Sequence, residues 1–175
     1  MNVLIVGAGN MGRGIATRLA AANAKLTIYD IDRAKAQAIA TEVGGQIANT
    51  ALEAVAASDI VVLASWYAVN VEMAKSLGAA LKGKIVVDIS NPLNATYDGL
   101  VTAPGKSAAE EIANLLPKSA VVKAFNTTFA GTLVNGTAGG EPLDDRRPER
   151  VEVVGLAAGD QVAVDDDLLV HPVGA

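Results

Sequence analysis

Residues 3–12 of this 175-residue chain read VLIVGAGNMG, an apolar run that passes directly into three glycines. Four consecutive aliphatic residues closed by Gly7 are typical of a strand that is buried on both faces. Met11, Ile15 and Leu19 then recur every four residues, which predicts a helix beginning at the glycines. The stretch therefore predicts a strand, a tight turn and a helix, the first unit of an α/β fold.

The same alternation of short apolar runs and helical stripes continues along the chain. We predict strands near residues 26–29, 46–48, 60–64, 84–89 and 120–125, and helices near 33–42, 51–57, 68–81 and 107–116. Strands that alternate with helices of this length form parallel units with right-handed crossovers. The predicted fold is a doubly wound, mostly parallel Rossmann-type sheet with helices on both faces, in three layers.

Composition narrows the classes of function. Hydrophobic residues make up 51% of the chain, which excludes a wholly disordered protein. There is no cysteine and one histidine, His171, so we expect neither a metal site nor a Cys nucleophile nor a Ser-His-Asp triad. Residues 1–140 carry 11 basic and 10 acidic residues, whereas residues 141–175 carry 3 and 9. We therefore expect no nucleic-acid partner, no membrane span or secretory signal, and a cytoplasmic protein.

The glycines form the pattern G-x-G-x-x-G between the predicted strand and helix. In a dinucleotide site Gly7 permits the turn, Gly9 admits the pyrophosphate and Gly12 allows close packing of helix on strand. Asp30 lies 18 residues after Gly12, at the end of the second predicted strand. Dinucleotide sites carry an acidic residue at this point. The alternative is a glycine-rich turn without a ligand. We predict a dinucleotide site whose turn also includes Asn10 and Met11.

The choice between NAD and NADP stays open on these residues. The carboxylate of Asp30 favours NAD, because it accepts hydrogen bonds from a ribose 2′-hydroxyl and repels a 2′-phosphate. Arg33 and Lys35 follow closely and could pair with that phosphate, or they could be solvated helix residues.

Three further segments end predicted strands, at the edge where open α/β sheets bind ligands. Ser65 and Trp66 follow one strand, and the tryptophan could cover a cofactor or plug the sheet edge. Asn91 and Pro92 follow another strand, where amides and backbone carbonyls could orient a nicotinamide or form an ordinary turn. Asn126 and Thr127 follow the last predicted strand and could contact a second substrate. We assign no catalytic residue, which favours direct hydride transfer between two redox cofactors over chemistry that needs a proton shuttle.

Five segments in order resemble the coenzyme F420-dependent NADP oxidoreductases and their bacterial relatives: GAGNMGR at 7–13, SW at 65–66, ISNPL at 89–93, SAAE at 107–110 and KAFNT at 123–127. The resemblance covers about residues 1–143 and implies hydride transfer between NADPH and a deazaflavin, coenzyme F420, or a flavin-like acceptor. It implies that Trp66 and the turn at Asn91 lie near the nicotinamide, that Asn126 lies near the deazaflavin, and that the protein is a homodimer. A dinucleotide-binding module without catalysis and an imine or carbonyl reductase are the alternatives.

The chain departs from the resemblance in two places. NADP-specific members carry Ser, Thr or Arg where this chain has Asp30. After the Rossmann domain at 1–143, the acidic segment 144–175 looks unrelated to the family, and native variation and a truncated reading frame are both consistent with it. Within it we predict strands at 151–154 and 161–164, paired as a short hairpin.

Overall fold

A single sheet lies at the centre of the computed structural model, which describes residues 1–143 and 152–154. Six of its strands are parallel, and the seventh, β9, runs antiparallel to β6. In spatial order the strands are β3 (Gln46–Ile47), β2 (Lys25–Tyr29), β1 (Asn2–Val6), β4 (Ile60–Leu63), β5 (Ile85–Asp88), β6 (Ala120–Lys123) and β9 (Glu152–Val154). Successive strands are added on one side of β1 as far as β3 and then, from β4, on its other side, which is the Rossmann order, so the predicted fold class is confirmed.

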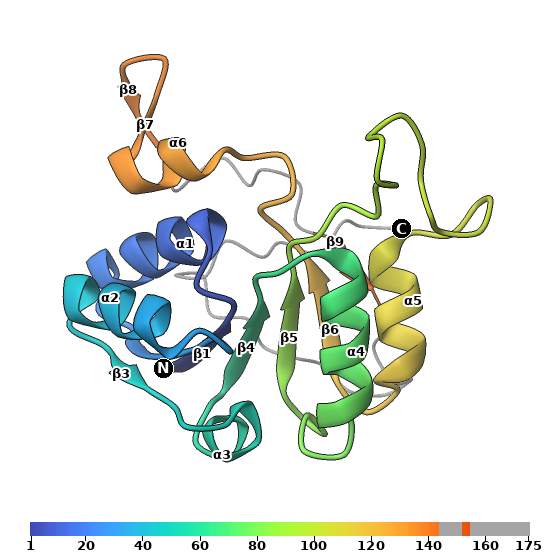
Figure 1. Ribbon diagram of the computed structural model, residues 1–175, viewed down its shortest axis with the longest axis horizontal. Coiled ribbons are helices and arrows are strands. Elements are labelled where there is room, and N and C mark those ends of the chain that lie inside the picture. Colours follow the sequence, from blue (N-terminus) through green and yellow to red (C-terminus); the bar gives the residue numbers. More distant parts are fainter. Residues whose placement is uncertain (144–151, 155–175) are drawn as a thin grey trace.

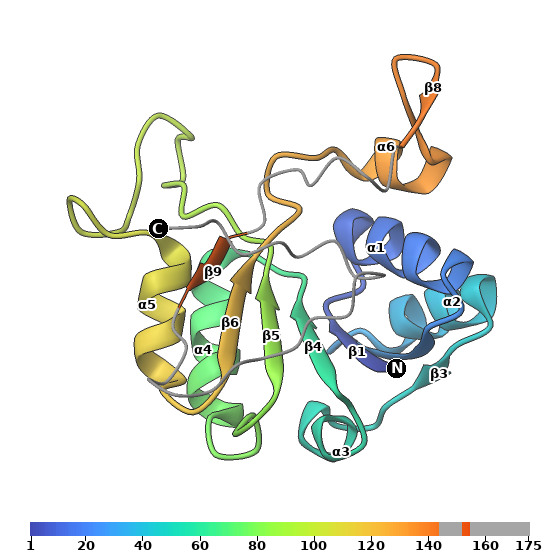
Figure 2. The same cartoon turned by 180° about the vertical axis from the view of Figure 1, so that it is seen from behind.

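Helices cover both faces of the sheet, because successive strand residues point to opposite sides. On β1, Val3 and Ile5 face one apolar cluster, and Leu4 and Val6 face the other. The first cluster is covered by α1 (Asn10–Ala21), α2 (Arg33–Val43) and α6 (Ala130–Asn135). The second is covered by α3 (Ala51–Ala56), α4 (Tyr67–Leu77) and α5 (Ala108–Leu115). Figure 1 shows α4 and α5 in front of β5 and β6, and Figure 2 shows these strands from the opposite side.

Two segments of the described chain differ from expectation. α4 ends at Leu77 rather than near 81, because the chain turns at Gly78 and again at Gly83, whose φ is 74°. The segment after β6 forms α6 and a small hairpin of β7 (Thr137–Ala138) and β8 (Glu141–Pro142), none of which the apolar periodicity predicts. Gly139 and Gly140 form the turn of this hairpin with positive φ values.

The acidic segment contributes one described strand. β9 agrees with the strand predicted at 151–154, but it pairs with β6 and so extends the main sheet. The second predicted strand of that hairpin, 161–164, lies outside the described residues.

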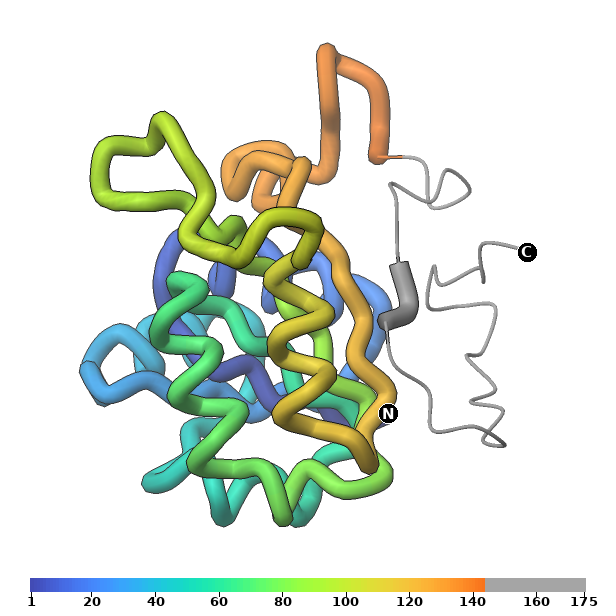
Figure 3. Tube along the Cα trace, turned by 90° about the vertical axis from the view of Figure 1, so that its right-hand side faces the viewer, coloured from blue at the N-terminus to red at the C-terminus, as the bar shows by residue number. Residues whose placement is uncertain are grey.

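Close packing of α6 on α1 sets the position of the hairpin. A Cβ on Gly14 would lie 2.9 Å from the Cβ of Leu133 and 3.1 Å from the carbonyl oxygen of Ala130. Figure 3 shows that the hairpin and the loop after β5 both rise from the same end of the body, beyond the carboxyl ends of the parallel strands. Within the described residues, no helix is both long and apolar enough to cross a membrane.

Candidate functional site

A turn built on glycine joins β1 to α1 at the carboxyl edge of the sheet. The Gly7 N–H donates to the carbonyl oxygen of Tyr29, at 2.8 Å, which ties the turn to the end of β2. The φ of Gly7 is 115°, and a Cβ there would lie 2.5 Å from the carbonyl oxygen of Ala64. A Cβ on Gly12 would overlap the carbonyl oxygen of Gly7. Backbone packing therefore requires glycine at both positions.

Gly9 differs from these two glycines because the space beside it is open. Its φ of −81° and ψ of −172° are accessible to any residue. A Cβ there would meet no heavy atom of the described chain within 4 Å, its chain neighbours aside. Gly9 caps α1, whose first residues are Asn10 and Met11, and a helix start presents unpaired N–H groups and partial positive charge. The turn can therefore receive a phosphate group in the space that a side chain would fill.

The carboxylate of Asp30 is turned toward the glycine turn. One oxygen accepts from the Ala8 N–H at 2.6 Å, and the other accepts from the Asp32 N–H at 2.8 Å. Asp30 thus clamps the glycine turn against the end of β2, a role that its place in the sequence does not reveal. A carboxylate has further lone pairs, so this geometry is compatible with a ribose contact and does not depend on one.

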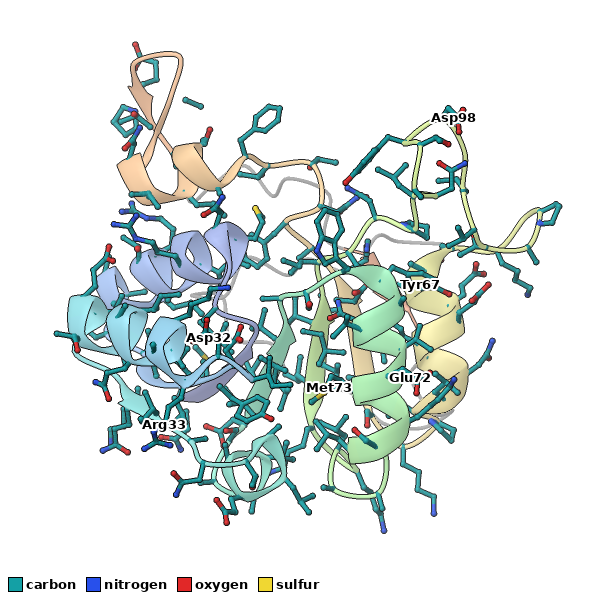
Figure 4. All side chains as sticks on the ribbon, in the orientation of Figure 1. Asp32, Arg33, Tyr67, Glu72, Met73 and Asp98 are labelled. Carbon is teal, nitrogen blue, oxygen red and sulfur yellow. The ribbon has the colours of Figure 1, made fainter. Side chains whose placement is uncertain are left out.

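Arg33 lies at the start of α2, just beyond this clamp. Its Nη1 donates to Oδ1 of Asn49 at 2.7 Å, and both residues are exposed. Lys35 is engaged with Asp32, which caps α2, at 3.6 Å. Figure 4 shows where Asp32 and Arg33 lie relative to α2. Arg33 therefore offers an exposed guanidinium near the end of β2, whereas Lys35 already faces a carboxylate.

Three exposed aromatic residues lie on the segments that follow β4, β5 and β6. Trp66, next to Ser65, is 68% exposed and meets Tyr97 edge to face, with 6.5 Å between ring centroids. Tyr97 is 63% exposed, and Phe129, after β6, is 81% exposed. The chain has only six aromatic residues, and half of them are exposed on these three loops. Exposed apolar groups in contact with one another, as Trp66 and Tyr97 are, commonly belong to a binding surface.

Tyr97 was missed by the sequence analysis, because its position depends on a loop held by polar side chains. Asp98 Oδ1 accepts from Asn94 Nδ2 at 2.8 Å and from the Thr96 hydroxyl at 2.6 Å. These contacts close the loop around Tyr97, whose φ is 60°. They also hold the pKa of Asp98 below its usual range, the Thr96 hydrogen bond being the main cause. Figure 4 marks Asp98 on this loop, above α4 and α5.

The structure brings together two of the segments singled out in the sequence. Nδ2 of Asn91 donates to the carbonyl oxygen of Asn126 at 3.1 Å, and Nδ2 of Asn126 donates back to Oδ1 of Asn91 at 3.4 Å. Pro92 follows, and its carbonyl oxygen accepts from the Val101 N–H at 2.8 Å. Thr127, next to Asn126, is exposed. The amide pair thus fixes the loop after β5 to the loop after β6.

A buried polar cluster beneath these loops was also missed. Asp88, the last residue of β5, is fully buried and pairs with Lys123, the last residue of β6, at 2.7 Å. Asn70 and Ser90 donate to the same carboxylate. A charged residue that ends an otherwise aliphatic strand was the available signal for both partners, since the preceding residues are IVV and AVV.

Tyr67 belongs to the helical layer rather than to the strand ends. Its hydroxyl donates to Oε2 of Glu111, and Figure 4 shows Tyr67 between α4 and α5. Burial, followed by the hydrogen bond to Glu111, raises the pKa of Tyr67 to about 12. The phenol therefore stays protonated at neutral pH.

Known proteins resemble this chain in sequence and in fold. The family described as NADP oxidoreductase, coenzyme F420-dependent, matches residues 2–92. An F420-dependent NADP reductase of Methanocaldococcus jannaschii is 34% identical over 145 residues, which cover 74% of this chain and 64% of the relative. The chain thus spans less than two thirds of that relative.

Two solved structures complete the comparison. A candidate F420-dependent NADP reductase of Arthrobacter sp. FB24 is 27% identical, with a TM-score of 0.72 over 89% of this chain and 74% of that one. An imine reductase of Bacillus cereus, 22% identical, matches with a TM-score of 0.57 over 70% of this chain and 39% of that one, which shows a shared fold.

Proposed function

This chain belongs to the family of coenzyme F420-dependent NADP oxidoreductases, and we propose that it transfers hydride between NADPH and a deazaflavin at the carboxyl edge of its sheet. The open space at Gly9 carries the proposal. Gly7 and Gly12 are glycine because the protein's own backbone lies against them, whereas nothing in the described chain fills the place of a side chain at Gly9. A pyrophosphate at the start of α1 explains why that place stays empty.

The topology orients a dinucleotide bound there. Ligands of open α/β sheets lie across the point where strand order reverses, which here falls between β1 and β4. With the pyrophosphate at Gly9, the adenosine half extends over β2 toward Arg33. The nicotinamide half extends over β4 and β5, toward Trp66 and the turn at Asn91. The residues singled out in the sequence thus follow the length of one dinucleotide.

We propose NADP as the preferred dinucleotide, in keeping with the family. The negative charge of Asp30 disfavours a nearby 2′-phosphate, but each of its oxygens accepts a backbone N–H of the chain, so its place is explained without a ribose contact. The guanidinium of Arg33 supplies the positive charge that a 2′-phosphate requires, in a planar geometry suited to phosphate oxygens.

Replacing Arg33 with alanine should therefore weaken NADPH binding by about 10- to 100-fold, the range of a lost charge-assisted hydrogen bond. NADH binding should change by less than about twofold, because NADH has no 2′-phosphate. Calorimetric titration of both dinucleotides measures the two effects. Lys35→Ala is the matched control and should leave both affinities unchanged, because Lys35 already faces Asp32. An equal loss for NADH and NADPH in Arg33→Ala would contradict the assignment.

The aromatic rings at the edge support a flat second substrate. Trp66, Tyr97 and Phe129 border the region where the nicotinamide would lie, and aromatic faces and edges favour contact with planar rings. In the proposed reaction a hydride leaves C4 of the nicotinamide with its electron pair and adds to C5 of the deazaflavin, while the deazaflavin takes one proton from solvent. The chain's residues align the two rings.

The reaction is tested by following the absorbance of oxidised deazaflavin with NADPH or NADH, with and without the purified protein. We expect protein-dependent bleaching, faster with NADPH. Parallel reactions contain a flavin or a cyclic imine in place of the deazaflavin, and both should be slower. Faster turnover of the imine would identify an imine reductase. Binding of NADPH by a folded protein without turnover of any acceptor would identify a binding module, and either result would overturn the proposal.

A further inference from the structure

Lys123 and Asp88 form an ion pair in the interior, where stability alone does not explain one. The two residues are register partners at the carboxyl ends of β5 and β6. Asp88 is fully buried, and the side chain of Lys123 is 14% exposed. Removing two charges from water is costly, and apolar residues of similar size often stabilise a fold equally well. The reason for the ion pair must therefore be sought in the neighbouring groups that it positions.

Every polar group of Ser90 forms a hydrogen bond with Asp88 or Lys123. The N–H and the hydroxyl of Ser90 donate to Oδ1 of Asp88, at 3.1 and 2.7 Å. The carbonyl oxygen of Ser90 accepts from the ammonium group of Lys123. One cation thus neutralises the carboxylate and also fixes the backbone just before Asn91. An apolar residue at either position could not perform both tasks.

The same carboxylate reaches the loop after β4 through Asn70. Nδ2 of Asn70 donates to Oδ1 of Asp88 and to the carbonyl oxygen of Leu63, both at 2.9 Å. Oδ1 of Asn70 accepts from the Ser65 N–H at 3.2 Å. Asn70 is fully buried, so this link is rigid. Loops from neighbouring strands, which carry Trp66 and Asn91, therefore rest on one buried cluster.

We propose that Lys123 is a positioning residue for the nicotinamide: through Asp88 and the Ser90 carbonyl it holds the loops after β4 and β5 in the geometry that receives the ring. The inference rests on the proposed function, because it assumes a dinucleotide at Gly9. Its effect is confined to one half of that ligand. The adenosine half lies over β2, on the other side of the point where strand order reverses.

Effects on the nicotinamide half and on the adenosine half can be distinguished by comparing two ligands. These are NADPH and 2′,5′-ADP, which lacks the nicotinamide. Lys123→Met keeps an unbranched side chain, shorter by one atom, and removes its charge. We expect its 2′,5′-ADP affinity to stay within about twofold, its NADPH affinity to fall about tenfold relative to that of 2′,5′-ADP, and hydride transfer to slow about 100-fold. Affinities are measured by calorimetry, and the fold is checked by thermal unfolding.

Lys84→Met is the matched control. The ammonium group of Lys84 also donates to a carbonyl oxygen, that of Ser58, at 2.6 Å. Lys84 lies at the amino end of β5, however, whereas Asp88 lies at its carboxyl end. Its ratio of NADPH to 2′,5′-ADP affinity should match that of the unmodified chain. The double variant Asp88→Asn, Lys123→Met removes the pair without leaving an unpaired charge and serves if Lys123→Met does not fold. It should show the same selective loss.

A folded variant that keeps the affinity ratio overturns the inference, as does an equal loss for both ligands, which indicates a merely structural role. These readouts do not require turnover. Failure of the proposed function is a separate result, because it appears in the unmodified chain as a failure to bind NADPH or to transfer hydride. The two failures are therefore distinguishable.

Discussion

Replacing Gly9 with valine should abolish NADPH binding while the protein keeps its fold. The backbone at Gly9 is already in a conformation that valine adopts readily, and a Cβ there meets open space. The new side chain would occupy the place proposed for the pyrophosphate and cover the first N–H groups of α1. We expect the dissociation constant for NADPH to rise at least about 100-fold, or about 2.7 kcal/mol, measured by calorimetry.

Two further variants make this result specific. Ala38→Val also places a valine on the protein, on the exposed face of α2, and should leave binding unchanged at a cost of no more than about 0.7 kcal/mol in stability. Gly12→Ala should destabilise the fold by about 3 kcal/mol or more, because its Cβ would overlap the backbone of Gly7. An NADPH affinity of Gly9→Val within about threefold of the unmodified chain would place the pyrophosphate elsewhere.

Replacing Asp88 with alanine should lower the free energy of unfolding by about 3–5 kcal/mol, since it leaves the ammonium group of Lys123 buried without its partner. Ser90 and Asn70 lose their acceptor in the same change. For a chain of this size the loss corresponds to a fall of roughly 10 °C in the midpoint of thermal unfolding. Urea denaturation measures the free energy directly.

An exposed aspartate provides the comparison for Asp88. Asp59 accepts from the N–H of Asn2 at 2.8 Å on the surface, so Asp59→Ala should cost no more than about 1 kcal/mol. If Asp88→Ala were equally mild, the ion pair would not be the buried support described for the loops after β4 and β5.

Much of the fold could be predicted from the sequence because its signals are local. The run 3–6 and the spacing of Met11, Ile15 and Leu19 reflect how a strand and a helix bury their own residues. The glycine turn was predictable for the same reason, since close backbone packing dictates Gly7 and Gly12 within a few residues. The resemblance to a family rested on the order of the later segments, and the family is confirmed.

The missed features depend on contacts between distant residues. Asp88 and Lys123 are 35 residues apart, and only the register of β5 with β6 makes them neighbours. The carboxylate of Asp30 could face the ribose or the chain, and only the folded turn shows it bound to the Ala8 N–H. Tyr97 lies beside Trp66 because Asp98 closes the loop that carries it. This loop has neither the hydrophobic periodicity of a helix nor that of a strand, so the sequence does not indicate its shape.

The most direct measurement of the proposed reaction follows the hydrogen itself. NADPH is prepared with deuterium at C4 of the nicotinamide, on one face or the other, and is mixed with oxidised deazaflavin and the protein in ordinary water. We predict that one of the two labelled forms delivers a single deuterium to C5 of the reduced deazaflavin, as detected by mass spectrometry, because the two rings exchange hydride directly. Reduced deazaflavin without deuterium from either form, or no reduction by a folded protein that binds NADPH, would contradict direct transfer between two rings at the edge of this sheet.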